Sequence, residues 1–201
     1  GDRIHQVDRA ELQASGAVLR PQFVQRPTAF TYFYRGNYQE LMTALTKSEA
    51  RNQQIAADIL AEGRAATGSV LVVSDRVAHC ERLADLLRRS VPVAVLTGQT
   101  PNEERARIVE AIHRGELKVL ISTVQLIGEG FDCPGLHTLF LTTPIKFTGR
   151  VLQVVGRILR PAAGKQPKVY DYVDSVRVLQ SSAQARFRLF QDEPQQELGH
   201  G

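Results

Sequence analysis

Five short, mostly apolar runs alternate with helical stretches, and this alternation constrains the fold more than any other feature. Residues 70–73 are wholly apolar and β-branched or leucine, which is typical of a strand covered on both faces. Further candidate strands lie at residues 91–96, 118–123, 138–142 and 169–173. Strands that alternate with helices predict a parallel sheet with helices on both of its faces.

The stretches between these runs carry apolar residues at helical spacing. Residues 37–66 hold two such stripes, so they are expected to form a helix in two pieces. Thr100, Pro101 and Glu103 predict a helix start, with Thr100 as the cap and Pro101 at the first helical position. Further helices are expected from about residue 76, around residues 151–160 and at residues 175–191.

Three regions follow from this pattern. Residues 1–36 are the least patterned, and Pro21 and Pro27 disfavour a long helix there, so an N-terminal arm or linker along one edge is expected. Residues 37–191 are expected to form one α/β domain. Residues 192–201 are polar and are expected to form a disordered tail.

Composition limits the function classes. A net charge of +4 and an isoelectric point near 9.3 permit a polyanionic partner without requiring one. The two cysteines form no disulfide framework, which favours a reducing compartment such as the cytoplasm. The five histidines are scattered, and no apolar run approaches a membrane helix, so neither a zinc site nor a membrane partner is expected.

Polar residues follow four of the predicted strands directly. Ligands of parallel sheets bind beyond the carboxyl ends of the strands, where free amides and hydroxyls can hold phosphates. The alternative for each position is a residue that only caps the next helix, and the two interpretations are about equally supported. The residues concerned are Ser74, Asp75, Thr97, Gly98, Thr123, Thr142 and Thr143.

A glycine-rich loop occupies residues 128–135. Three glycines and a proline predict a tight, shaped turn, and Glu129 and Asp132 place two acidic groups inside it. An ordinary surface turn is the alternative, because a Gly-x-Gly alone is a weak signal.

Three long polar side chains interrupt the apolar helix expected at residues 151–160. Gln153, Arg157 and Arg160 are spaced by four and three residues, so they share one helix face. Gly156 lowers helix stability by about 1 kcal/mol relative to alanine, which suggests a close approach there. Anions would offset the desolvation of two guanidinium groups, and pairing with local carboxylates is the alternative.

In this order, the stretches resemble motifs IV to VI of the C-terminal RecA-like domain of superfamily-two DEAD/DEAH-type helicases. Residues 70–75 resemble motif IV, residues 96–98 with Arg105 the next nucleic-acid-contacting segment, residues 122–132 motif V and residues 153–160 motif VI. The Glu-Gly-Phe-Asp loop and the leading Gln153 are closest to the DNA-repair and restriction-type translocase branch. Val154 stands where many relatives carry a second arginine.

The resemblance implies a RecA-like, three-layer α/β/α fold and part of an ATP-dependent helicase that acts on nucleic acid, with DNA favoured over RNA. It implies that an N-terminal RecA-like domain of the same parent chain binds ATP and Mg²⁺, and that Arg157 and Arg160 act as catalytic arginine fingers. Nucleotide contacts are implied for Gln153, Gly156, Glu129, Gly130 and Asp132. Nucleic-acid contacts are implied for Ser74, Asp75, Arg76, Thr97, Gly98 and Thr123.

The sequence contains no Gly-x-x-x-x-Gly-Lys-Ser/Thr phosphate loop and no Asp-Glu-x-His/Asp motif after a strand. The chain alone is therefore expected to be inactive as an ATPase. Two other interpretations stay open: a stand-alone RecA-like module that binds nucleic acid or protein, and a small-molecule α/β enzyme that uses the glycine-rich loop.

Overall fold

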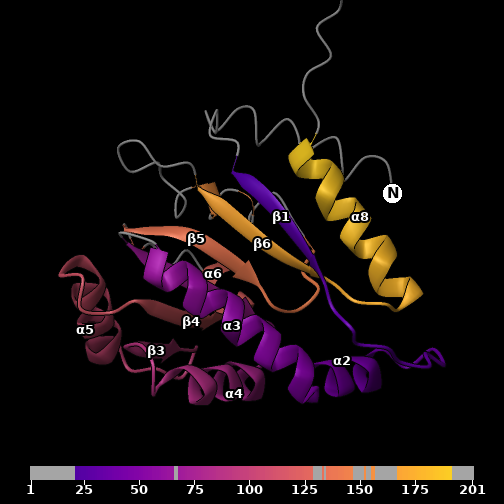
Figure 1. Ribbon diagram of the computed structural model, residues 1–201. Coiled ribbons are helices and arrows are strands. Elements are labelled where there is room, and N and C mark those ends of the chain that lie inside the picture. Colours follow the sequence, from indigo (N-terminus) through magenta and orange to yellow (C-terminus); the bar gives the residue numbers. More distant parts are fainter. Residues whose placement is uncertain are drawn as a thin grey trace, which may run out of the picture.

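The computed structural model describes residues 21–65, 68–128, 133, 135–146, 152, 155–156 and 167–191. Its elements alternate between strands and helices along most of the chain (Figure 1). They are β1 (Gln22–Pro27), α2 (Tyr38–Lys47), α3 (Glu49–Ala65), β2 (Ser69–Ser74), α4 (Val77–Leu87), β3 (Val93–Leu96), α5 (Asn102–His113), β4 (Val119–Thr123), α6 (Val124–Gly128), β5 (Leu136–Leu141), β6 (Lys168–Val173) and α8 (Arg177–Gln191).

The strands form one parallel sheet of six strands in the order β1-β6-β5-β2-β4-β3. The predicted α/β fold with a parallel sheet is therefore confirmed. All five predicted strands are present, with ends that differ by up to two residues.

The sixth strand, β1, lies inside the segment predicted to be an arm. It pairs in parallel with β6 at the edge of the sheet, with Gln22 opposite Lys168 and Pro27 opposite Val173. Residues of an edge strand are less buried than those of a central strand, and β1 has no fully buried residue. Its sequence therefore lacks the apolar signal that marks β2.

Side chains of alternate residues build a core on each face of the sheet. Val70 and Val72 of β2 pack with α3 and α4, whereas Leu71 and Val73 pack with α5 and α6. Helix α8 contributes Leu189 to the second of these cores. The arrangement is a three-layer α/β/α domain, as the helicase resemblance implied.

Two helix boundaries follow from local polar groups. Asn37 caps α2 by accepting a hydrogen bond from the Glu40 amide, and Ser48 separates α2 from α3, as the two-piece prediction requires. The predicted start of α5 is wrong by one residue. Pro101 is the N-cap rather than the first helical residue, and the Thr100 hydroxyl accepts a hydrogen bond from the Thr97 amide instead of capping the helix.

Candidate nucleic-acid interface

Three of the predicted nucleic-acid-contacting segments lie side by side at the carboxyl ends of neighbouring strands. Because the strands are parallel, all their carboxyl ends lie on the same side of the sheet, and we call this side the rim. Ser74 of β2 is the register partner of Thr123 of β4. Leu96 of β3, which precedes Thr97, pairs with Ser122 of β4. The rim therefore brings together residues separated by up to 49 positions in the sequence.

At the end of β2, Ser74 belongs to a buried hydrogen-bond chain. Its hydroxyl accepts from the Arg76 amide at 3.2 Å and lies 2.9 Å from His79 Nδ1. His79 Nε2 lies 2.8 Å from Asn52 Oδ1, and Asn52 Nδ2 donates to the Thr46 carbonyl at 2.9 Å. This order assigns the proton of neutral His79 to Nε2 and leaves Nδ1 to accept from Ser74.

Because Ser74 is fully buried, its hydroxyl shapes the end of β2 and is not presented to solvent. Burial, and after it the positive charges of Arg51 and Arg82, lowers the pKa of His79 to about 3. The imidazole is therefore neutral at physiological pH, and the chain of hydrogen bonds stays intact.

Asp75 and Arg76 are the parts of this segment that reach the surface. The Asp75 amide donates to Thr143 Oγ1 at 3.0 Å, which joins the end of β2 to the segment that follows β5. Partial desolvation raises the pKa of the Asp75 carboxyl, and Arg76 opposes this shift. The Arg76 guanidinium donates to Thr43 Oγ1 at 2.9 Å and to Gln39 Oε1 at 2.8 Å.

A compact turn follows β3. The Thr97 amide donates to Thr100 Oγ1 at 2.9 Å, and Arg105 donates to the carbonyls of residues 97, 98 and 100 at 3.0–3.3 Å. Arg105 therefore closes the turn from inside the chain. Gly98 is exposed at the tip of the turn, and a Cβ added there would meet no described atom within 4 Å.

At the end of β4, Thr123 is buried and the chain passes directly into α6. The sequence did not predict this short helix. Its Leu126 and Ile127 are buried against the sheet, whereas Gln125 is exposed. The surface that the β4 segment adds to the rim therefore lies at the start of α6.

A second buried network, which the sequence analysis missed, lies beneath the rim. Arg51 of α3 donates to both carboxylate oxygens of Asp174, at 2.8 and 3.2 Å, and to the Thr142 carbonyl at 2.8 Å. A signal was available, because Arg51 and Asn52 precede Ile55 by four and three residues and therefore share the buried helix face.

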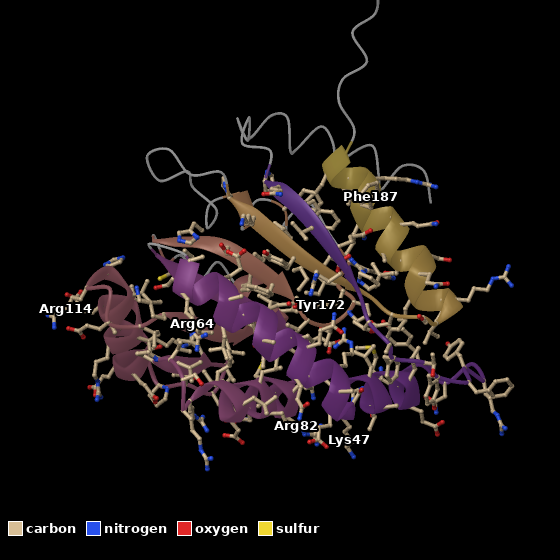
Figure 2. The ribbon with its side chains drawn as sticks, in the orientation of Figure 1. Lys47, Arg64, Arg82, Arg114, Tyr172 and Phe187 are labelled. Carbon is tan, nitrogen blue, oxygen red and sulfur yellow. The ribbon has the colours of Figure 1, made fainter. Side chains whose placement is uncertain are left out.

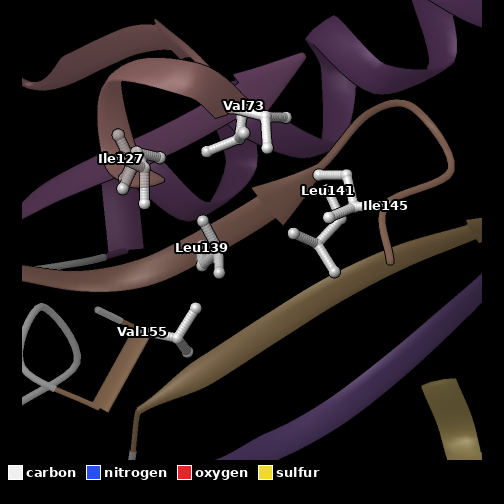
Figure 3. Close-up of a pocket in the computed structure, with 8 residues that line it drawn as sticks. Val73, Ile127, Leu139, Leu141, Ile145 and Val155 are labelled. Carbon is white, nitrogen blue, oxygen red and sulfur yellow. The ribbon is translucent and has the colours of Figure 1, made fainter. Parts of the chain in front are cut away.

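Two apolar residues of the predicted motif VI helix are described, and both are buried as expected. Leu152 and Val155 are helical and belong to the core, whereas Gly156 is exposed. Val155 and Ile127 of α6 line a small cavity of about 10 Å³, with apolar walls, over β2 and β5 (Figure 3). An added Cβ at Gly156 would meet no described atom within 4 Å, so this part of the structure does not require a glycine there.

The other predicted site residues lie outside the described residues. They are Glu129, Gly130, Asp132, Gln153, Arg157 and Arg160. Within the described ranges, no three His, Cys, Asp or Glu side chains are placed to hold a metal ion. None of the described helices combines the length and the apolar character that crossing a membrane requires.

Comparison with known proteins gives the same assignment as the motifs. The helicase conserved C-terminal domain family matches residues 51–162. The ATP-dependent DNA helicase uvsW of Enterobacteria phage T4 is 25% identical over 193 residues, which is 92% of this chain and 38% of the phage protein. UvrABC system protein B of Nitratidesulfovibrio vulgaris is 24% identical over 176 residues, 85% of this chain and 23% of that protein.

Solved structures show the same fold. The crystal structure of T4 UvsW superposes with a TM-score of 0.68 at 19% identity, over 83% of this chain and 38% of that chain. The C-terminal domain of the DEAD-box protein Dbp5 gives a TM-score of 0.63 at 17% identity, over 88% of this chain and 89% of that one. The chain thus spans less than half of the curated relatives named above. By sequence and by fold, it belongs to the helicase conserved C-terminal domain family.

Proposed function

We propose that this chain is the C-terminal motor domain of an ATP-dependent DNA helicase or translocase and that its rim binds the backbone of one nucleic-acid strand. The observation that carries the proposal is the placement of three motif segments on the adjacent strands β2, β4 and β3. Gly98 and Asp75 are exposed at two of these ends. The similarity to T4 uvsW, which is named a DNA helicase, supports DNA over RNA.

The nucleotide would lie between this domain and an N-terminal RecA-like domain of the same parent chain. Phosphoryl transfer from ATP requires neutralisation of negative charge on the transferred group, and bound Mg²⁺ would supply part of that neutralisation. In this proposal Arg157 and Arg160 donate to the phosphate oxygens, and Gln153, Gly156, Glu129, Gly130 and Asp132 contact the nucleotide. The cytoplasm is the proposed location.

The described contacts join the rim to the segment that follows β5. Thr143 accepts a hydrogen bond from the Asp75 amide at the rim. Thr143 also lies at the end of β5, in the segment that leads towards the motif VI helix. This hydrogen bond would carry a displacement of the segment after β5 to the end of β2.

A stand-alone RecA-like module that binds nucleic acid or protein is the second candidate. ATP hydrolysis by a parent chain that contains this domain would distinguish the first candidate from the second.

Gly98 allows a direct test of the rim. Gly98→Glu places a negative charge on the exposed tip of the β3 turn without a steric clash, so we expect it to weaken single-stranded DNA binding by about tenfold. Gly98→Gln has nearly the same size and no charge, and it should bind like the unmodified chain. Arg114→Gln changes the net charge equally at the end of α5, away from the rim, and should have little effect. Fluorescence anisotropy of a labelled oligonucleotide measures all three, and equal losses in all three variants would contradict the proposal.

A further inference from the structure

An aromatic segment, residues 30–38, links β1 to α2 and lies next to the rim. It holds five aromatic side chains: Phe30, Tyr32, Phe33, Tyr34 and Tyr38. Phe30, Tyr32 and Tyr34 pack against a cluster formed by α2 and the start of α8. Phe33 is instead 78% exposed, more than any other exposed large hydrophobic residue described.

The segment is held in place by hydrogen bonds and a defined turn. The Phe30 amide donates to Thr28 Oγ1 at 3.2 Å, and the Phe30 carbonyl accepts from the Ser175 amide at 3.1 Å. Gly36 has a φ of 93°, which favours glycine, and Asn37 then caps α2. These contacts fix both ends of the segment that carries Phe33.

A positive charge lies on the exposed ring. The Arg35 guanidinium carbon is 5.2 Å from the centroid of Phe33, a cation–π geometry. Arg76 donates to Gln39, directly after this segment, and Arg177 begins α8, whose Leu179 belongs to the same cluster. An exposed aromatic ring with arginine beside it is the combination that proteins use to stack the bases of single strands while attracting their phosphates.

The aromatic segment is continuous with the rim. Arg76, at the end of β2, donates to Gln39 Oε1, next to Tyr38. Burial raises the pKa of the Tyr38 phenol, and the charge of Asp75 raises it further, whereas the charge of Arg186 lowers it. In Figure 1 the coil between β1 and α2 lies at the side of the sheet where α8 begins, just after the carboxyl end of β6.

We propose that Phe33, with Arg35 on its ring, is a base-stacking platform for a single strand whose backbone lies on the rim. This inference rests on the proposed nucleic-acid binding and adds a contact to bases, whereas the contacts proposed for the rim are to the backbone. Nucleic acid is favoured over a protein surface because the residues on either side of Phe33 that also face solvent, Thr31 and Arg35, are polar. Stacking tolerates all four bases, so the platform would add affinity without sequence preference.

The absence of tryptophan from the sequence makes a direct test possible. Phe33→Trp introduces a single indole at the platform, and stacking of a base on it should quench its fluorescence when oligo-dT is added. Phe187→Trp is the matched control, because Phe187 is also a partly exposed aromatic residue, 39% exposed and near the end of α8 (Figure 2). We expect no quenching in the control.

An oligonucleotide of abasic sites separates base contacts from backbone contacts. It has the same phosphates as oligo-dT, and the unmodified chain should bind it about tenfold more weakly, as expected when one stacked base is lost. Phe33→Ala should bind both oligonucleotides with equal affinity. Because the side chain is exposed, this substitution should leave the melting temperature almost unchanged.

Two results would overturn the platform while leaving the proposed function intact. One is oligonucleotide binding that Gly98→Glu weakens but that does not quench the Phe33→Trp indole. The other is equal quenching by oligo-dT and the abasic strand. Quenching that appears only on addition of a separate protein domain would assign Phe33 to a protein contact and also overturn it. A chain that binds no oligonucleotide even at low salt would contradict both proposals.

Discussion

Arg51 and Asp174 form a bidentate ion pair in which each side chain is only 1% exposed. Arg51 lies in α3, and Asp174 directly follows β6. The third contact of Arg51, to the Thr142 carbonyl, adds the end of β5, and the Tyr172 ring lies 5.8 Å from its guanidinium carbon. Thr28, which follows β1, also donates to Asp174. One ion pair thus fixes the ends of three strands relative to a helix.

Removal of one partner of this pair should destabilise the domain strongly. Arg51→Met leaves the buried Asp174 carboxylate without its cation, so we expect a loss of about 3–5 kcal/mol in the free energy of unfolding, measured by urea denaturation. Arg88→Met is the control, because Arg88 forms ion pairs that are half exposed and should contribute less than about 1 kcal/mol. Equal stabilities for the two variants would show that the buried pair is not structural.

The hydrogen-bond chain through His79 makes stability depend on pH. The pKa of His79 is lowered to about 3 in the folded protein, against an ordinary value near 6.5. The unfolded chain therefore takes up a proton below about pH 6.5 that the folded domain takes up only near pH 3. The stability linked to His79 is fully present above pH 6.5 and is lost as the pH falls towards 3, with a slope that approaches about 1.4 kcal/mol per pH unit.

His79→Gln should remove this slope. Its free energy of unfolding should be lower than that of the unmodified chain at pH 7, and the difference should shrink between pH 6 and pH 4. His113→Gln, at an exposed position, should follow the unmodified chain. Urea denaturation at four pH values measures the difference, and a constant gap between His79→Gln and the unmodified chain would contradict the assignment of a neutral, buried imidazole.

Residues 70–73 and 118–121 predicted the central strands because both faces of these strands are covered, so nearly every side chain is apolar. The edge strand β1 was missed because Gln22, Gln25 and Arg26 meet solvent or other polar groups there. Thr100 matched a capping pattern, yet its hydroxyl bonds the Thr97 amide in the turn before the helix. Local sequence does not reveal which of two nearby amides a hydroxyl will bond.

The sequence analysis identified the motif segments by their order along the chain. The register of β2, β4 and β3 shows that these segments lie at neighbouring strand ends. The sequence did not predict which polar side chains of these segments form hydrogen bonds within the protein. Ser74 bonds His79, and Arg105 bonds the carbonyls of its own turn. Ser74 and His79 are five residues apart, and Arg105 bonds carbonyls seven and eight residues before it. These groups meet only because a strand ends and the next helix begins there, and a pattern of residue types does not encode that geometry.

Binding of single-stranded DNA by the isolated chain should be weak and salt-dependent. With a net charge of +4 and only a few backbone contacts, about three phosphates are expected to be neutralised, which gives a slope near −2 in log affinity against log salt. Homopolymeric and mixed sequences should bind alike, because backbone contacts and stacking do not read base edges. Titrations at 50 and 200 mM salt measure the slope, and an affinity that does not change with salt would contradict binding through the rim.

Arg157 and Arg160 carry the last prediction. In a parent chain with ATPase activity, Arg157→Ala or Arg160→Ala should lower ATP turnover by at least about 10²-fold, because each guanidinium is proposed to meet charge that develops in the transition state. Lysine should restore little, since an ammonium group lacks the planar fork that bridges two phosphate oxygens. The isolated chain should hydrolyse no ATP at a useful rate, with or without DNA.

The same substitutions in the isolated chain separate catalysis from structure. If the two arginines act on a nucleotide held by another domain, Arg157→Ala and Arg160→Ala should change the melting temperature of this chain only slightly. If they instead pair with carboxylates buried in this domain, each substitution should destabilise it by about 3–5 kcal/mol, as expected for Arg51→Met. Thermal melts of the chain, compared with turnover per folded parent molecule, distinguish these cases. Destabilised variants of the chain, together with unchanged turnover per folded parent molecule, would exclude the arginine-finger assignment.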